Sequence, residues 1–154
     1  MKLSSPAFGP NEAIPPQYTC DGANAHPPLA FEGVPPEAKS LVLIMEDPDV
    51  PKGIVPGDVF DHWVVFNIPP KTEAAKEGEP LPGTYGTNSG GQAAYTGPCP
   101  PEGEHRYVFR LYALDAQLAL KKGAAKKEVL EAIDGHIIAE SELVARYERK
   151  NLKA

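Results

Sequence analysis

The chain has 154 residues, a length that suits one domain with a core of its own, and we expect a single domain over residues 1–154. Its hydrophobic fraction of 42% and charged fraction of 23% are ordinary for a globular protein, while its net charge of −6 argues against nucleic-acid binding, which depends on Lys and Arg. Its 18 prolines and 14 glycines, spread without a repeat, argue against a helical bundle and favour short strands joined by stiff loops.

The first 40 residues are rich in proline and are expected to be mostly loop, with room for short strands at Lys2–Ser4 and Pro28–Glu32. The next segment, Ser40–Glu46, is a continuous apolar run, which is the pattern of a strand buried on both faces. Asp47 and Asp49 follow it among prolines. Because Asp and Pro are common turn formers, a turn is the simplest interpretation of this stretch.

Residues 58–68, "DVFDHWVVFNI", are rich in Val, Phe and Trp and predict a further strand. Side chains alternate between the two faces of a strand. Strict alternation places four side chains on one face of this strand: Phe60, His62, Val64 and Phe66. Trp63 and Val65 are then expected on the opposite face.

The second half of the chain contains one long irregular connection and the clearest strand. Residues 71–104 hold "GTYGTNSGG" and "GPCPPEGE" and show no periodic pattern, which in a compact domain often marks a functional loop. Residues 105–115, "HRYVFRLYALD", alternate and place His105 and Tyr107 on one face, with Arg106 on the other. Ala124–Ile133 predicts one short helix. The last segment, "IIAESELVARYER", fits a helix or a strand.

Common catalytic motifs are missing from the sequence. The glycines near residue 90 match neither a dinucleotide-binding fingerprint nor a phosphate-binding loop, and no G-x-S-x-G or H-E-x-x-H motif occurs. Nucleotide-dependent and serine-hydrolase chemistry therefore have no support, and no cofactor is expected.

Several polar residues stand at expected strand ends. A lone strand histidine is usually structural, and each of Asp47, His62, His105 and Tyr107 has such an ordinary explanation when taken alone. Together, two imidazoles and a phenol on neighbouring strands would make a polar pocket in an apolar wall, which is how small-ligand sites are built. Imidazoles titrate near neutrality and can donate to an anion, and a carboxylate such as Asp47 would orient them.

The sequence contains no apolar run of signal-peptide or transmembrane length, so we expect a cytoplasmic protein. Cys20 and Cys99 are far apart in the sequence and cannot by themselves form a four-thiolate zinc site. Because a reducing compartment disfavours disulfides, free thiols are expected for both.

At this point the motifs resemble those of the phosphatidylethanolamine-binding proteins, also called Raf kinase inhibitor-like proteins. "DPDVP" (Asp47 to Pro51) is similar to the family's D-P-D-x-P signature, and "GEHR" (Gly103 to Arg106) is similar to its G-x-H-R signature. "DHWVVFNI" occupies the place of the family's histidine-bearing strand. "YTCDGANAHPPL" and "GPCPPEG" resemble the bacterial and archaeal branch in particular, so the resemblance covers nearly the whole chain in order.

The resemblance implies a mainly β fold. We therefore expect a phosphatidylethanolamine-binding-protein-like Greek-key β-sandwich, with a large sheet packed on a small one and short helices near the C-terminus. It also favours a strand for "ELVARYER". Because Cys20 and Cys99 both fall in motifs of the prokaryotic branch, it implies that the two cysteines lie close together, although free thiols stay the expectation from composition.

The resemblance also assigns site residues, matched motif by motif. It implies an anion pocket at one end of the sheets, with these lining residues: Asp47, His62, His105, Tyr107, Phe60 and Pro101. The structural members of the two signatures are Pro48, Asp49, Pro51, Gly103 and Arg106. Asp49 and Arg106 are expected to fix the loop and a buried polar contact. His26 stands where bacterial relatives commonly have a serine, and a surface loop is expected for it, with a third histidine near the pocket mouth as the alternative.

These observations favour a small soluble binding protein rather than an enzyme. Its expected ligand is a small anion, a phosphate or a phospholipid headgroup. The resemblance leaves open a further role as an inhibitor or regulator of a kinase or protease, with such an enzyme as partner. The alternative is a metal-dependent hydrolase with His62, His105 and Asp47 as ligands, since these are suitable ligand types. The sequence leaves a homodimer open and does not identify the physiological ligand.

Overall fold

The computed structural model describes residues 1–150, and strands in this range form two antiparallel sheets. The three-stranded sheet has the order β1 (Lys2–Ser4), β2 (Leu29–Glu32) and β5 (Ala74–Ala75). The five-stranded sheet has the order β6 (Thr84–Tyr85), β4 (Phe60–Ile68), β3 (Ser40–Asp47), β7 (His105–Leu114) and β8 (Ile137–Tyr147). The helical elements are two 3-10 turns, η1 (Pro16–Tyr18) and η2 (Pro56–Asp58), and the helix α1 (Lys126–Ile133).

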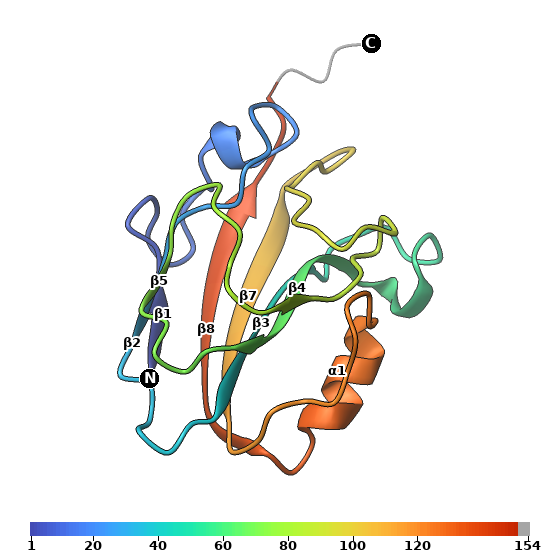
Figure 1. The fold of residues 1–154 in the computed structure, drawn as a ribbon. Helices are drawn as coiled ribbons and strands as arrows, with labels where there is room; N and C mark the ends of the chain where they lie inside the picture. The colour runs from blue at the N-terminus through green and yellow to red at the C-terminus, as the bar shows by residue number, and fades with distance from the viewer. Residues whose placement is uncertain (151–154) are drawn as a thin grey trace.

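The large sheet forms the middle layer of the domain. The small sheet covers one face of it, and α1 lies on the other side (Figure 1). A large apolar core fills the space between the two sheets, and a smaller one fills the space between the large sheet and α1. Leu43 of β3 packs in the first core and Ile44 in the second, and both are buried. The prediction that this apolar run is a strand buried on both faces is confirmed.

The strand β7 alternates as predicted. Tyr107, Phe109 and Leu111 point into the core between the sheets, while Arg106 and Arg110 lie on the other face. The segment that fitted a helix or a strand is β8, which pairs antiparallel with β7 from His105↔Tyr147 to Leu114↔Ile137. Pairing with β7 makes this segment a strand rather than a helix. That pairing cannot be recognised from the sequence of the segment itself.

The prediction for the faces of β4 is wrong at His62. A bulge interrupts the pairing of β4 with β3, because Met45 pairs with Trp63 whereas Glu46 pairs with Asp61. His62, between these two pairs, therefore has no pairing partner on β3. Beyond the bulge, Val64 packs in the core beside α1, but the His62 ring lies against Tyr107, on the side of the core between the sheets. Bulges redirect side chains in this way, and they are frequent beside binding sites.

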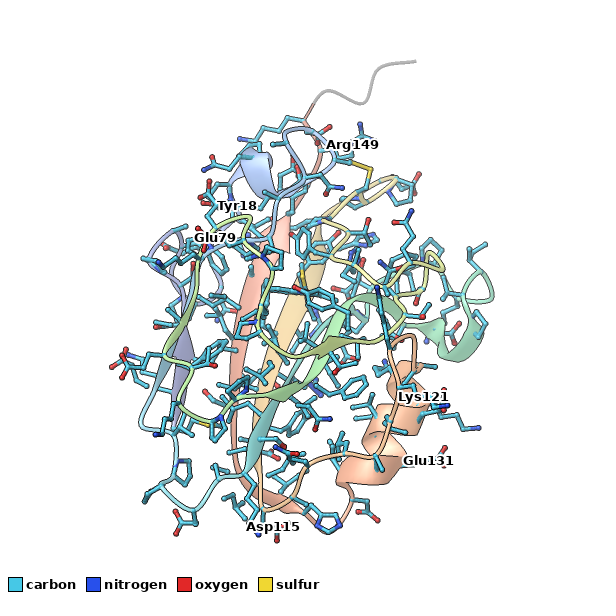
Figure 2. The ribbon with its side chains drawn as sticks, viewed as in Figure 1. Tyr18, Glu79, Asp115, Lys121, Glu131 and Arg149 are labelled. Atoms are coloured by element: carbon cyan, nitrogen blue, oxygen red, sulfur yellow. A yellow bond between two sulfur atoms is a disulfide. The ribbon has the colours of Figure 1, made fainter. Side chains whose placement is uncertain are left out.

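The expectation of free thiols is also wrong. Cys20 and Cys99 form a disulfide, which Figure 2 shows as the yellow bond near Arg149. The two cysteines lie close together, as the family motifs implied. Their loops run side by side, since the backbone N–H of Cys20 donates to the carbonyl of Pro98 at 3.1 Å, and that of Gly97 donates to Asn24 Oδ1 at 2.8 Å. The disulfide therefore depends on contacts between two segments that lie 79 residues apart in the sequence.

Candidate functional site

The end of β3 meets the beginning of β7 at one edge of the large sheet, because these neighbouring strands are antiparallel. The geometry brings Asp47, the last residue of β3, to His105, the first residue of β7. His105 Nδ1 lies 2.6 Å from Asp47 Oδ2, and both side chains are buried. The carboxylate accepts the Nδ1–H, which fixes the tautomer and the orientation of the ring and leaves Nε2 without a protein partner.

His62 reaches the same place from the bulge in β4. Its Nδ1 donates to the carbonyl of Thr96 at 2.7 Å, in the loop before β7. Burial lowers the pKa of His62, and the Thr96 carbonyl and the Asp47 carboxylate oppose that effect without cancelling it. The ring is therefore neutral around neutral pH, and its Nε2, which has no protein partner, carries a lone pair. Sequence patterns could not identify Thr96, because it acts through its backbone.

Tyr107 stands beside both histidines. Its ring lies 5.3 Å from the His62 ring and 6.4 Å from the His105 ring, measured between centroids. Within residues 1–150 the buried phenol oxygen makes no hydrogen bond of acceptable geometry, although the Asp47 carboxylate lies near enough to interact with it. Burial raises the pKa of Tyr107, and the charge and hydrogen-bonding contact of Asp47 raise it further, so the phenol is a neutral donor. A buried hydroxyl without a partner costs about 1–3 kcal/mol, a cost that a bound acceptor would remove.

We refer to Asp47, His62, His105 and Tyr107 as the Asp–His cluster. It offers a buried phenol hydroxyl and two imidazole Nε2 atoms that make no hydrogen bond within residues 1–150. Phe60 belongs to the same neighbourhood, since its ring lies 4.7 Å from that of His62. Such a set can interact with a small polar group through the Tyr107 hydroxyl and the two imidazole Nε2 atoms.

The two signature motifs meet in an ion pair beside the cluster. Asp49 Oδ2 accepts the backbone N–H of Arg106 at 2.8 Å and its Nε–H at 2.9 Å, and Asp49 Oδ1 accepts from a terminal nitrogen at 2.8 Å. Arg106 bonding lowers the pKa of Asp49. The predicted contact exists, but it is not buried, because 59% of the Arg106 side chain is exposed. A solvated guanidinium can form this bidentate bond without the cost of burying its charge.

The remaining signature residues shape the loops around the cluster. Asp47 Oδ1 accepts the backbone N–H of Asp49 at 2.7 Å, so the turn around the half-buried Pro48 is closed by the same carboxylate that holds His105. Gly103 has a φ of +73°, which glycine adopts without strain. Pro51 and Pro101 are exposed in the loops after β3 and before β7. No bond joins either proline to the cluster.

The expectation that His26 lies in a surface loop is wrong. Only 6% of His26 is exposed, and its ring stacks on Trp63 with a centroid distance of 4.7 Å. Its Nε2 faces the carbonyl of Glu79 at 2.5 Å, and its Nδ1 faces that of Pro27 at 3.1 Å. The aromatic wall and the two carbonyls compensate the burial of the ring. His26 makes no bond to the Asp–His cluster.

Residues 1–150 contain no group of three or more His, Cys, Asp or Glu side chains arranged to hold a metal ion. None of the helices described there is long and apolar enough to cross a membrane.

Comparison with known proteins gives consistent matches over nearly the whole chain. The family model described as "Phosphatidylethanolamine-binding protein" matches residues 4–148. A "UPF0098 protein" of Methanothermobacter thermautotrophicus is 49% identical, with 97% of this chain and 99% of the relative covered, and one of Chlamydia trachomatis is 46% identical with the same coverage.

Solved structures agree with these matches. A putative phosphatidylethanolamine-binding protein homolog from Chlamydia trachomatis has a TM-score of 0.94 at 46% identity, with 97% of each chain covered. Escherichia coli YbcL, described as a new member of the mammalian family, has a TM-score of 0.86 at 27% identity, covering 97% of this chain and 98% of its own. The expected architecture, a sandwich of a large and a small sheet, is thereby confirmed.

Proposed function

The chain belongs to the phosphatidylethanolamine-binding protein family, and from that premise we propose that it is a small binding protein whose Asp–His cluster holds a phosphate-like anion. The observation that carries the proposal is the buried Tyr107 hydroxyl without a partner, placed beside two imidazole rings. A phospholipid headgroup and free phosphate both offer non-bridging phosphate oxygens to this cluster, but only free phosphate or a phosphate monoester can also offer a P–OH proton. The experiments below address which group, if any, is attached to the phosphate.

The protonation states limit which anion fits. Tyr107 donates to a phosphate oxygen in every relevant state, because its pKa is raised. The neutral His62 has its one N–H turned to Thr96, so its Nε2 accepts and suits a phosphate group that still carries a proton. His105 presents its Nε2 to the same ligand, because Asp47 holds the ring through Nδ1. The cluster is thus matched to a singly charged phosphate or phosphate monoester.

The test is calorimetric titration with phosphate and with phosphoethanolamine between about pH 5.5 and 8.5. The phosphate group of either ligand loses its remaining proton over this range, so affinity is expected to fall as the pH rises. A His62→Ala/His105→Ala double variant is expected to lose binding. The matched control is His136→Ala, since His136 is an exposed histidine bonded to Asp115 at 2.8 Å. Undiminished binding by the double variant would refute the proposal.

Better binding of phosphoethanolamine than of phosphate would indicate that the lipid headgroup is the relevant source. Equal binding would indicate that the cluster recognises the phosphate alone. The two ligands share the phosphate chemistry and differ in the ethanolamine, so their ratio separates the two cases without altering the protein.

The alternative function is a metal-dependent hydrolase that uses His62, His105 and Asp47. It is less well supported, because Asp47 already holds the His105 ring through Nδ1 and His62 points its own Nδ1 at Thr96. The two Nε2 atoms would be the available ligands. Elemental analysis of protein purified without chelator distinguishes the two functions, and a stoichiometric transition metal would favour the hydrolase.

Regulation of a protein kinase or protease is compatible with the anion site. Carboxypeptidase Y inhibitor, solved with its cognate proteinase, shares the fold with a TM-score of 0.56 at 19% identity, covering 97% of this chain and 83% of its own. That likeness extends to the fold alone. An inhibition assay with wild type and the His62→Ala/His105→Ala variant would show whether any inhibition depends on the cluster. A cytoplasmic location and a homodimer stay predictions.

A further inference from the structure

A second candidate site lies outside the Asp–His cluster and beyond the function proposed for it. A cavity of about 650 Å³, here called the Tyr85 cavity, opens between β6 and the segments around residues 78–83 and 93–95. Its wall includes His26, Leu81, Tyr85, Ala94, Tyr95 and Lys122. No residue of the Asp–His cluster lines it. The volume is within the range of small-molecule sites, about 300–1,000 Å³.

Most of the wall offers apolar surface. Leu81 and Ala94 are aliphatic, and the polar atoms of the Tyr95 and His26 rings are already used within the protein. Tyr95 donates its hydroxyl to the carbonyl of Tyr18 at 2.7 Å, and both nitrogens of His26 face carbonyl oxygens. The body of a ligand in this cavity therefore meets carbon atoms and aromatic faces.

Tyr85 and Lys122 are polar groups of the wall that can donate a hydrogen bond to a ligand. The Tyr85 oxygen accepts the backbone N–H of Leu81 at 2.9 Å, while its own hydrogen has no acceptor. Lys122 is exposed, and none of the ion pairs found within residues 1–150 includes it. An ammonium and a hydroxyl hydrogen together complement a carboxylate, which accepts from both. No carboxylate side chain lines the cavity.

We propose that the Tyr85 cavity binds a small apolar carboxylate, with its acid group between Lys122 and Tyr85 and its apolar body against Leu81 and Tyr95. The cavity is formed where β6 pairs with β4, at Val65↔Tyr85, so one wall belongs to the large sheet. The loop that carries Lys122 is fixed to that strand, because Gly123 N donates to the carbonyl of Tyr85 at 2.9 Å. The two donors are thus held on adjoining backbone.

The chain supplies its own reporter for this site. Trp63 is the single tryptophan, and it stacks on His26 at 4.7 Å and meets Tyr95 edge-on at 5.2 Å, between ring centroids. Both rings line the cavity. A ligand that contacts them is expected to change the emission of Trp63. The probe should not absorb near the excitation wavelength of tryptophan, so that it does not itself reduce the Trp63 emission.

The probe is 3-cyclohexylpropionate, titrated into the full-length, disulfide-bonded protein, with 3-cyclohexylpropionamide as the uncharged control of the same shape. We expect a saturable change in Trp63 emission with the acid, confirmed by calorimetry, and about tenfold weaker binding of the amide. Equal binding of the two, or no saturable binding of the acid, would overturn the proposal. Displacement of the probe by inorganic phosphate would assign it to the Asp–His cluster and would also overturn it.

The variants use two neighbouring lysines. Lys122→Gln is expected to weaken binding of the acid by about three- to tenfold and to leave binding of the amide unchanged. Lys121→Gln is the matched control, since Lys121 is equally exposed, adjoins Lys122 on the segment that leads into α1 (Figure 2) and does not line the cavity. Equal losses in the two variants would contradict a local contact with Lys122. Melting curves of both variants confirm that they fold.

Discussion

The Asp47 carboxylate bonds to the His105 ring at 2.6 Å and also closes the turn that follows it, through the backbone N–H of Asp49 at 2.7 Å. Each of its two oxygens therefore has a partner within the protein. In the proposed function, Asp47 therefore affects a ligand through the His105 ring that it orients, rather than by contacting the ligand. Asp49 acts one step further away, by joining the turn to Arg106.

The first prediction concerns Asp47. In Asp47→Asn the amide keeps the shape of the carboxylate but loses its charge, so the His105 ring loses the charged acceptor that fixes its Nδ1–H. We expect phosphate affinity to fall by about tenfold or more, as for the loss of one charge-assisted bond. Calorimetric titration of both proteins with phosphate at one fixed pH measures the effect. Unchanged affinity in this variant would show that His105 acts without its carboxylate.

The second prediction concerns Asp49, for which stability is expected to change before binding. Asp49→Asn loses the bidentate bond to Arg106, and since the Arg106 side chain is 59% exposed the cost is expected to be about 1 kcal/mol. The pKa of Asp49 is lowered in the folded protein, so the pair stabilises the fold above the usual carboxyl pKa. That stability is lost as the pH falls through the lowered value.

Denaturant unfolding of wild type and Asp49→Asn at several pH values measures this contribution. The two proteins should differ at neutral pH and converge in strong acid. Glu104→Gln is the matched control, because Glu104 pairs with Arg146 at 2.8 Å on the surface and closes no turn. A loss in Glu104→Gln as large as that in Asp49→Asn would indicate a general effect of surface charge.

The third prediction concerns the pH dependence that His62 gives to stability. Burial lowers its pKa, so the folded protein binds fewer protons at this ring than the unfolded chain does. The contribution of His62 to stability is complete above its ordinary pKa, about 6.5, and declines as the pH falls towards the lowered folded value. His62→Gln removes this dependence. Unfolding free energies of both proteins from about pH 8 to 5 test it, and a ring that titrates at or above its ordinary pKa would contradict it.

The sequence predicts strongly patterned elements well. The apolar run from Leu41 to Met45 and the alternation around Tyr107 are local features that a strand requires, and both strands formed where they were expected. The same holds for the pairing of Asp49 with Arg106, since the two family signatures place them at neighbouring strand ends. In each case the information lies in a short stretch of chain or in a known motif.

The features that were missed depend on contacts between distant segments. The bulge at His62 reverses the face of one side chain, and nothing in the composition of β4 indicates it. His26 is buried because Trp63 and the carbonyl of Glu79 happen to meet it, from segments far along the chain. The expectation of free cysteines rested on an assumed compartment, whereas the loop contacts near Cys20 determine the pairing.

The fourth prediction concerns the disulfide between Cys20 and Cys99. It closes a loop of 79 residues, and opening a loop of this length is expected to cost about 2–4 kcal/mol, a fall in melting temperature on the order of 10 °C. The loop after Tyr95 carries Thr96, whose carbonyl holds His62, so phosphate binding should weaken together with stability. Melting curves and phosphate titrations with and without reductant measure both effects. The Cys20→Ser/Cys99→Ser variant is the control. Its melting temperature and phosphate affinity should resemble those of the reduced protein and should not change when reductant is added. Identical melting of the oxidised and reduced proteins would show that the neighbouring hydrogen bonds hold these loops without the disulfide.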